Sequence, residues 1–207
     1  MVSPYDKSGN FEVKQQLAKL AVDQVENHTI VGIGSGSTME LFVELLAKRI
    51  ATEKLDLQFV ASSKKIEAKA NAVGINFKEI DEFTYIDHAF DGADRVDGLG
   101  NLIKGGGGSL FRERQLLLMA KKKTILADES KFVSSFQNQI IPIEVVPFNV
   151  NFTMKQLEKI GLKVTKRNSV DGAFLTDNGN YIVDAFLLSH KNITNMYQEM
   201  KLMSGVV

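Results

Sequence analysis

A loop rich in glycine and serine, residues 32–38, is the first segment whose residue types could do chemistry. It reads Gly-Ile-Gly-Ser-Gly-Ser-Thr and follows a short apolar run. Glycines let a backbone approach a ligand closely, and free amides at the start of a helix favour an anion. Ser35, Ser37 and Thr38 add hydroxyl donors beside Gly36. The loop therefore predicts a phosphate cradle; the alternative is a tight strand-to-helix turn in which Ser37 is the N-cap.

The same loop does not match either common nucleotide-binding fingerprint. The Gly-Lys-Ser/Thr of a P-loop is absent, and the glycines read G-x-G-x-G rather than G-x-G-x-x-G. No acidic residue clearly ends the next predicted strand; Asp56 precedes it. The loop is therefore neither a P-loop nor a dinucleotide-binding turn.

Two carboxylates, Asp91 and Asp94, frame a second loop with Gly92 and Ala93 between them. Such a pair can split its pKa values and serve as acid and base. The alternative is an ordinary Asx turn, a common use of Asp-Gly. Asp87 and Asp97 lie nearby, but the four aspartates do not have the spacing of an EF-hand, and we expect no metal.

The third loop, residues 104–109, reads Lys-Gly-Gly-Gly-Gly-Ser and leads into Leu-Phe-Arg-Glu-Arg. Its glycines, which are costly to order, can present amides to a ligand, and Lys104 could stabilise a developing enolate oxygen. Glu113 lies about one turn into the next predicted helix. It could be a catalytic base, or it could lie on a solvated helix face that forms ordinary ion pairs. Lys131 is a pocket cation or a surface lysine.

Alternating strands and helices position these loops. Apolar runs predict strands at 29–33, 57–61, 86–90 and 124–127, and helical periodicity predicts helices at 11–26, 38–50, 64–72 and 109–120. This alternation implies a parallel sheet with right-handed crossovers. Ligands bind outside the carboxyl ends of the strands of such a sheet, which is where the loops fall.

The pattern changes after about residue 132. Strands are predicted at 140–146 and 162–165, helices at 154–160 and 193–203, and a hairpin at 174–187 around Asp-Asn-Gly-Asn. This predicts a smaller α+β domain. We expect residues 1–132 to form the first domain, 133–203 the second, and 204–207 to begin a return to the first.

Composition narrows the class of protein. The 207 residues include 25 basic and 25 acidic side chains and no cysteine. A neutral chain does not indicate nucleic acid, and the apolar runs are too short to span a bilayer. We expect a cytoplasmic protein that binds neither nucleic acid nor membrane.

The motifs together resemble ribose-5-phosphate isomerase type A along nearly the whole chain. They are the three loops with Arg112 and Glu113, Ala-Asp-Glu-Ser-Lys at 127–131, and Leu-Thr-Asp-Asn-Gly-Asn at 175–180. Each motif is modest alone, but their order and spacing in one chain are highly specific. One departure is Arg95, where the family usually has glutamate after Asp-Gly-Ala-Asp.

This resemblance implies a Rossmann-like parallel-sheet domain and a smaller, ferredoxin-like α+β domain. It implies an aldose–ketose isomerase of the non-oxidative pentose phosphate pathway, which interconverts D-ribose 5-phosphate and D-ribulose 5-phosphate through an enediol without cofactor or metal. It also implies a homodimer or homotetramer.

The resemblance implies that Glu113 is the base and that Lys104 stabilises the enediolate. It also implies that Asp91 and Asp94 transfer the protons of ring opening and of the hydroxyl groups. The implied substrate contacts are Ser35, Gly36, Ser37, Thr38, Asp91, Gly92, Ala93, Asp94, Lys104, Gly105, Gly106, Gly107, Lys131 and Lys14. Alternatives are a non-catalytic sugar-phosphate sensor, an amino-sugar phosphate deaminase and a coenzyme A transferase.

Overall fold

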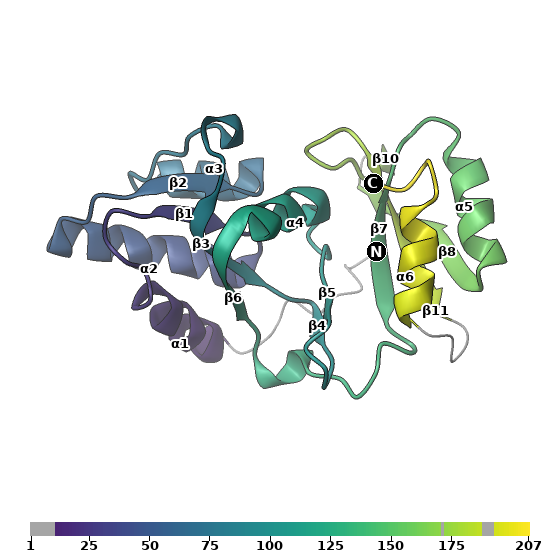
Figure 1. Ribbon diagram of the computed structural model, residues 1–207, viewed down its shortest axis with the longest axis horizontal. Coiled ribbons are helices and arrows are strands. Elements are labelled where there is room, and N and C mark those ends of the chain that lie inside the picture. The colour runs from purple at the N-terminus through teal and green to yellow at the C-terminus, as the bar shows by residue number, and fades with distance from the viewer. Residues whose placement is uncertain (1–10, 171, 188–192) are drawn as a thin grey trace. The chain divides into compact units, whose positions relative to one another are not determined.

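The structure is a computed structural model that describes residues 11–170, 172–187 and 193–207 (Figure 1). It divides into two compact units. The sheet unit comprises the described residues up to Asp94 together with Arg112–Phe132, and the small unit comprises Arg95–Phe111 together with Val133–Val207. Residues 95–111, expected in the first domain, thus cluster with the residues that follow 133.

The sheet unit is built on four parallel strands in the order β2-β1-β3-β6. The strands are β1 (Ile30–Ile33), β2 (Gln58–Ala61), β3 (Ile86–Gly92) and β6 (Ala120–Leu126). Helix α1 (Phe11–Val22) precedes β1, and the helices between the strands are α2 (Ser37–Glu53), α3 (Lys64–Asn71) and α4 (Leu110–Met119). Two short 3-10 turns are η1 (Ile80–Glu82), before β3, and η2 (Glu129–Lys131), after β6.

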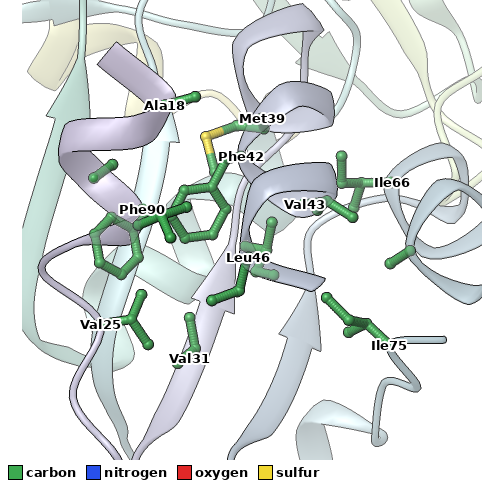
Figure 2. Close-up of a cluster of buried hydrophobic side chains, with 14 of the residues drawn as sticks. Ala18, Val25, Val31, Met39, Phe42, Val43, Leu46, Ile66, Ile75 and Phe90 are labelled. Atoms are coloured by element: carbon green, nitrogen blue, oxygen red, sulfur yellow. The ribbon is translucent and has the colours of Figure 1, made fainter. Parts of the chain in front are cut away.

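One face of this sheet is covered by α1, α2 and α3. Figure 2 shows Met39, Phe42, Val43 and Leu46 of α2 packed with Phe90 of β3 in a buried cluster. The rings of Phe42 and Phe90 lie 4.8 Å apart. Removing these side chains from water supplies the main stabilisation of the helices, since most helical stability in proteins comes from tertiary packing.

The opposite face of the sheet is covered by α4. Leu116 of α4 is buried with Val60, Ile86, Ala89 and Ala120. This packing fixes the helix that carries Glu113 in its first turn.

Strand β6 begins earlier than its apolar pattern indicates. We expected it at 124–127, but it pairs with β3 from Ala120 onward. Its first half is a run of exposed lysines, Lys121, Lys122 and Lys123. An edge strand with lysines pointing to water lacks the apolar signal that marks a buried strand.

The small unit is built on an antiparallel sheet in the order β7-β11-β8. Its strands are β7 (Ile140–Val145), β8 (Leu162–Lys166) and β11 (Tyr181–Leu187), and its helices are α5 (Val150–Lys159) and α6 (Ile193–Lys201). Val145, Leu157, Val183 and Met196 belong to their shared core. Two short pairs complete it: β4 (Arg95–Val96) with β5 (Leu102–Ile103), and β9 (Asn168–Ser169) with β10 (Gly172–Ala173).

The element order β7-α5-β8-β11-α6 follows the β-α-β-β-α part of a ferredoxin-like arrangement. The predicted fold class, a parallel-sheet domain with a smaller α+β domain, is confirmed.

Two details of the small unit differ from the pattern. The predicted hairpin is reduced to one bridge, Leu175 to Tyr181, because β11 uses its edges to pair with β7 and β8. Residues 204–207, expected to begin a return to the first domain, lie against β7, where Val206 bridges Val145.

Candidate active site

The order in which strands are added to the parallel sheet reverses between β1 and β3. The chain crosses from β1 to β2 on one side and then returns to place β3 on the other side of β1. Such a switch point opens a crevice at the carboxyl ends of the two strands. The 32–38 loop leaves β1 there, and Asp91, the next-to-last residue of β3, lies beside it, since Ile33 pairs with Phe90.

Gly34 and Asp91 touch across this switch point. A Cβ added to Gly34 would lie 2.1 Å from both Cγ and Oδ1 of Asp91. Asp91 is 2% exposed, and the Gly92 amide donates a hydrogen bond of 2.7 Å to Oδ1. Only glycine at position 34 leaves room for this buried carboxylate.

The 32–38 loop ends at the first turn of α2. Gly36 is the N-cap with a φ of +99°, a conformation that glycine adopts without strain. Ser37 is the first residue of the helix, so the alternative in which Ser37 is the N-cap is wrong. Ser35 and Thr38 are half-buried, whereas Gly36 and Ser37 are exposed to solvent, as a cradle for an outside anion requires.

Glu113 lies in the first turn of α4 and is only 4% exposed. The hydroxyl of Ser35 donates a hydrogen bond of 2.5 Å to Oε1 of Glu113. The alternative of a solvated helix face is therefore wrong for Glu113, although the neighbouring Arg114 is exposed. The structure thus joins the 32–38 loop to the candidate base.

The other candidate residues of the sheet unit lie at different depths. Gly92, Ala93 and Asp94 are half-buried at and just beyond the end of β3. Lys131 is half-buried in η2, which follows β6 at the edge where Gly92 pairs with Leu126. Lys14 is buried within α1, at 6% exposure.

The glycine run after Lys104 belongs to the small unit. Gly105 has a φ of +96° and receives a turn hydrogen bond of 2.9 Å from the Gly108 amide. A Cβ on Gly105 would meet Leu110 Cβ at 2.7 Å, so the turn is packed against the start of α4. Lys104 and Gly106 are half-buried and Gly107 is exposed.

Arg95, the departure from the family pattern, also lies in the small unit. Its Nε donates a hydrogen bond of 2.9 Å to Oε1 of Gln139. The guanidinium is therefore at least partly engaged by a side chain of its own unit.

No group of three or more histidine, aspartate or glutamate side chains in ranges 11–170, 172–187 and 193–207 could hold a metal ion. Within the same ranges, no helix is both long and apolar enough to cross a bilayer.

The sequence did not indicate three side-chain contacts that the structure contains. Ser35 was expected to bind substrate, and its bond to Glu113 was not foreseen because the two residues are 78 positions apart. Arg167 and Asp184 were not singled out, yet they form an ion pair, and Arg167 contacts the glycine run. An aspartate inside the apolar run of β11 was the available signal, because buried carboxylates are paired.

Comparisons with known proteins identify the family of the chain. A model of the family described as "Ribose 5-phosphate isomerase A (phosphoriboisomerase A)" matches residues 58–207. Ribose-5-phosphate isomerase A of Staphylococcus haemolyticus is 40% identical over 198 residues, which are 95% of this chain and 86% of that protein.

Two solved structures are similar over most of their length. Ribose 5-phosphate isomerase A of Methanocaldococcus jannaschii is 33% identical, covers 96% of this chain and 89% of its own, and has a TM-score of 0.90. A D-ribose-5-phosphate isomerase in complex with phospho-erythronic acid is 32% identical, covers 95% and 87%, and has a TM-score of 0.89. The chain belongs to the ribose 5-phosphate isomerase A family.

Proposed function

We propose that the protein interconverts D-ribose 5-phosphate and D-ribulose 5-phosphate, with Glu113 as the base. One observation carries the assignment of the base: a buried carboxylate in the first turn of α4 is held by Ser35 of the 32–38 loop. Membership of the family supports the substrate and the reaction.

The reaction moves one proton between two carbons. The carboxylate of Glu113 removes the proton from C2, and the electron pair left behind forms the C1–C2 double bond of an enediolate. The former C1 carbonyl oxygen takes the negative charge and then a proton, while the C2 hydroxyl gives up its proton, so the charge passes to the C2 oxygen. The proton then returns from Glu113 to C1 as the C2 oxygen becomes the carbonyl, so one carboxylate within reach of both carbons suffices.

The remaining candidates divide the other tasks. Lys104 and the amides of Gly105, Gly106 and Gly107 would stabilise the negative oxygen of the enediolate, which typically lowers a barrier by about 3 kcal/mol per donor. Asp91 and Asp94 would move the hydroxyl protons during ring opening.

The phosphate would anchor the far end of the substrate. The amides at the start of α2 and the hydroxyls of Ser35, Ser37 and Thr38 form the proposed cradle, with Gly36 between them and Lys14 and Lys131 as cations. Binding energy from this remote group then orients the reacting carbons.

We also propose a cytoplasmic enzyme of the non-oxidative pentose phosphate pathway that forms a homodimer or homotetramer. Exposed apolar side chains of the small unit support an interface, since Phe148 is 88% and Leu202 is 86% exposed. Sedimentation velocity of the purified chain tests the assembly, and a monomer at micromolar concentration would contradict it.

The reaction is tested by incubating the protein with ribose 5-phosphate in D₂O and following the sugar by NMR. Ribulose 5-phosphate should form and deuterium should enter at the exchanging carbon, with unchanged rates in excess EDTA. Unphosphorylated ribose is the matched control and should turn over far more slowly. Binding of ribose 5-phosphate without any ketose or deuterium would support the sensor instead, and ammonia release from glucosamine 6-phosphate would support the deaminase.

A further inference from the structure

The guanidinium of Arg167 in the small unit binds both Asp184 and the glycine run. Its Nε donates a hydrogen bond of 2.9 Å to Oδ2 of Asp184, and Nη2 bonds Oδ1 of the same carboxylate. Its Nη1 points to the glycine run and donates to the carbonyl of Gly106 at 3.0 Å, with the carbonyl of Gly105 at 3.4 Å. The side chain of Arg167 is 11% exposed and that of Asp184 is 16% exposed.

These contacts determine where two amides of the glycine run point. A trans peptide is planar, so its carbonyl and the amide of the next residue lie on opposite sides. The described residues contain no cis peptide bond. When Arg167 draws the carbonyls of Gly105 and Gly106 toward itself, the amides of Gly106 and Gly107 are turned to the opposite side.

Arg167 makes three further contacts, two through its backbone and one through its guanidinium. Its amide donates to the carbonyl of Ile182 at 2.8 Å, and its carbonyl accepts from the Phe174 amide at 3.0 Å. The guanidinium lies 5.7 Å from the Phe174 ring. The same ring closes on the glycine run, because a Cβ at Gly108 would lie 2.5 Å from it.

Glycine loops need such support. Successive glycines have many accessible conformations, and ordering them is costly. A loop that presents amides to a developing oxyanion must hold them in place before the reaction, because preorganisation is the source of their effect. The half-buried ion pair joins Arg167, which follows β8, to Asp184 of β11, and it can impose that order.

We propose that Arg167, fixed by Asp184, is a positioning residue that orders the Gly106 and Gly107 amides for the proposed stabilisation of the enediolate oxygen. This inference rests on the proposed isomerase function. Arg167 acts through the backbone of the glycine run and does not touch the substrate.

The test compares Arg167→Met, Arg167→Lys and Asp184→Asn with the wild type in the isomerase assay. Lysine keeps the charge but has a single ammonium, which cannot hold a carboxylate in a fork and reach two carbonyls together. We expect kcat to fall about 10- to 100-fold in both Arg167 variants and less in Asp184→Asn, while KM changes by less than about threefold. Inhibition by inorganic phosphate should not change, because its proposed site lies on the 32–38 loop.

A matched control is available in Arg49 of α2. Its Nη1 donates to the carbonyls of Val22 and Val25, at 2.5 and 3.0 Å, and its Nε pairs with Glu53 at 3.0 Å. Arg49→Met therefore removes an equivalent anchor away from the glycine run. It should lower the melting temperature without lowering kcat.

Amide hydrogen exchange, read by NMR on the free protein, supplies an outcome that needs no activity. Exchange at Gly106 and Gly107 should quicken at least tenfold in Arg167→Lys and stay unchanged in Arg49→Met. Faster exchange with a lower kcat supports the proposal, and unchanged exchange or unchanged kcat overturns it. If the wild type fails to isomerise the sugar, the proposed function fails, while the exchange data still decide whether Arg167 orders the glycine run. If Arg167→Met does not fold, Arg167→Lys and Asp184→Asn carry the same comparison.

Discussion

The hydroxyl of Ser35 donates a hydrogen bond of 2.5 Å to the carboxylate of Glu113, across 78 positions of the chain. Ser35 follows β1 in the loop that precedes α2, and Glu113 lies in the first turn of α4. The bond therefore ties the proposed phosphate cradle to the proposed base. A phosphate that orders the loop would also orient the carboxylate.

Removing the Ser35 hydroxyl should misplace the base. We expect Ser35→Ala to lower kcat about tenfold, since a carboxylate that loses its hydrogen-bond donor can rotate away from the reacting carbons. Ser35→Thr, which keeps the hydroxyl, should recover part of the rate. Steady-state kinetics with ribose 5-phosphate give the answer, with the exposed Ser135→Ala as control. An unchanged kcat in Ser35→Ala would show that this bond has no role in turnover.

Gly34 should tolerate no side chain. An alanine Cβ would lie 2.1 Å from the Asp91 carboxyl group, so Asp91 must move by an ångström or more. We expect Gly34→Ala to lower kcat/KM about 100-fold, as misplacements of this size do. Gly98→Ala is the matched control, because a Cβ at Gly98 meets nothing within 4 Å. Equal kcat/KM in the two variants would contradict the assignment of Asp91 to the site.

Glu144 should stabilise the small unit without acting in catalysis. It is 1% exposed, and its Oε1 accepts hydrogen bonds from Thr176, Asn178 and Asn180, at 2.9, 3.2 and 2.9 Å. Glu144→Ala leaves these donors without their acceptor and should cost about 3 kcal/mol of unfolding free energy. Glu158→Ala, on the exposed side of α5, should change it by less than about 0.5 kcal/mol. Urea unfolding measures both, and similar values would contradict the role of Glu144.

His88 should make the protein less stable in mild acid. Burial, with a smaller contribution from Lys122, lowers the pKa of His88 from 6.5 to about 4. Its Nε2 lies 2.8 Å from Thr124 Oγ1, and its ring stacks 3.8 Å from that of Phe90. In the unfolded chain His88 binds a proton near pH 6.5, whereas in the folded chain it binds that proton only near pH 4. Stability is therefore full above pH 6.5 and falls as the pH drops toward 4.

The size of this acid effect is on the order of 1 to 2 kcal/mol, allowing for partial hydration of the ring. Denaturant unfolding at pH 7 and pH 5 should show a smaller loss in His88→Gln than in the wild type. His28→Asn, at an exposed turn with positive φ, should lose as much as the wild type. Equal losses in all three proteins would remove His88 as the cause.

The parallel sheet could be predicted from sequence because its strands and helices carry clean periodicities. The apolar run before Gly32 and the stripe of α2 that buries Phe42 both depend on local pattern alone. The apolar pattern predicts the start of β6 four residues after its actual start at Ala120. The reason is that Lys121 to Lys123 are exposed on an edge strand and carry no apolar signal.

Side-chain contacts between distant segments could not be predicted in the same way. The motif that contains Glu113 pointed to a base, but no local pattern encodes its contact with Ser35 or the contact of Arg167 with Gly106. These contacts arise from tertiary packing. Asp184 in β11 and Glu144 in β7 were the available signals, because a carboxylate within a buried strand needs a partner.

Glu113→Gln tests most directly whether Glu113 transfers the proton. Glutamine keeps the size and can still accept the Ser35 hydrogen bond, but its amide cannot take a proton from carbon. We expect a fall of several orders of magnitude in kcat, unchanged inhibition by inorganic phosphate, and loss of deuterium incorporation from D₂O. A kcat within about tenfold of the wild type, with deuterium still entering the product, would contradict the account and assign the proton transfer to another residue.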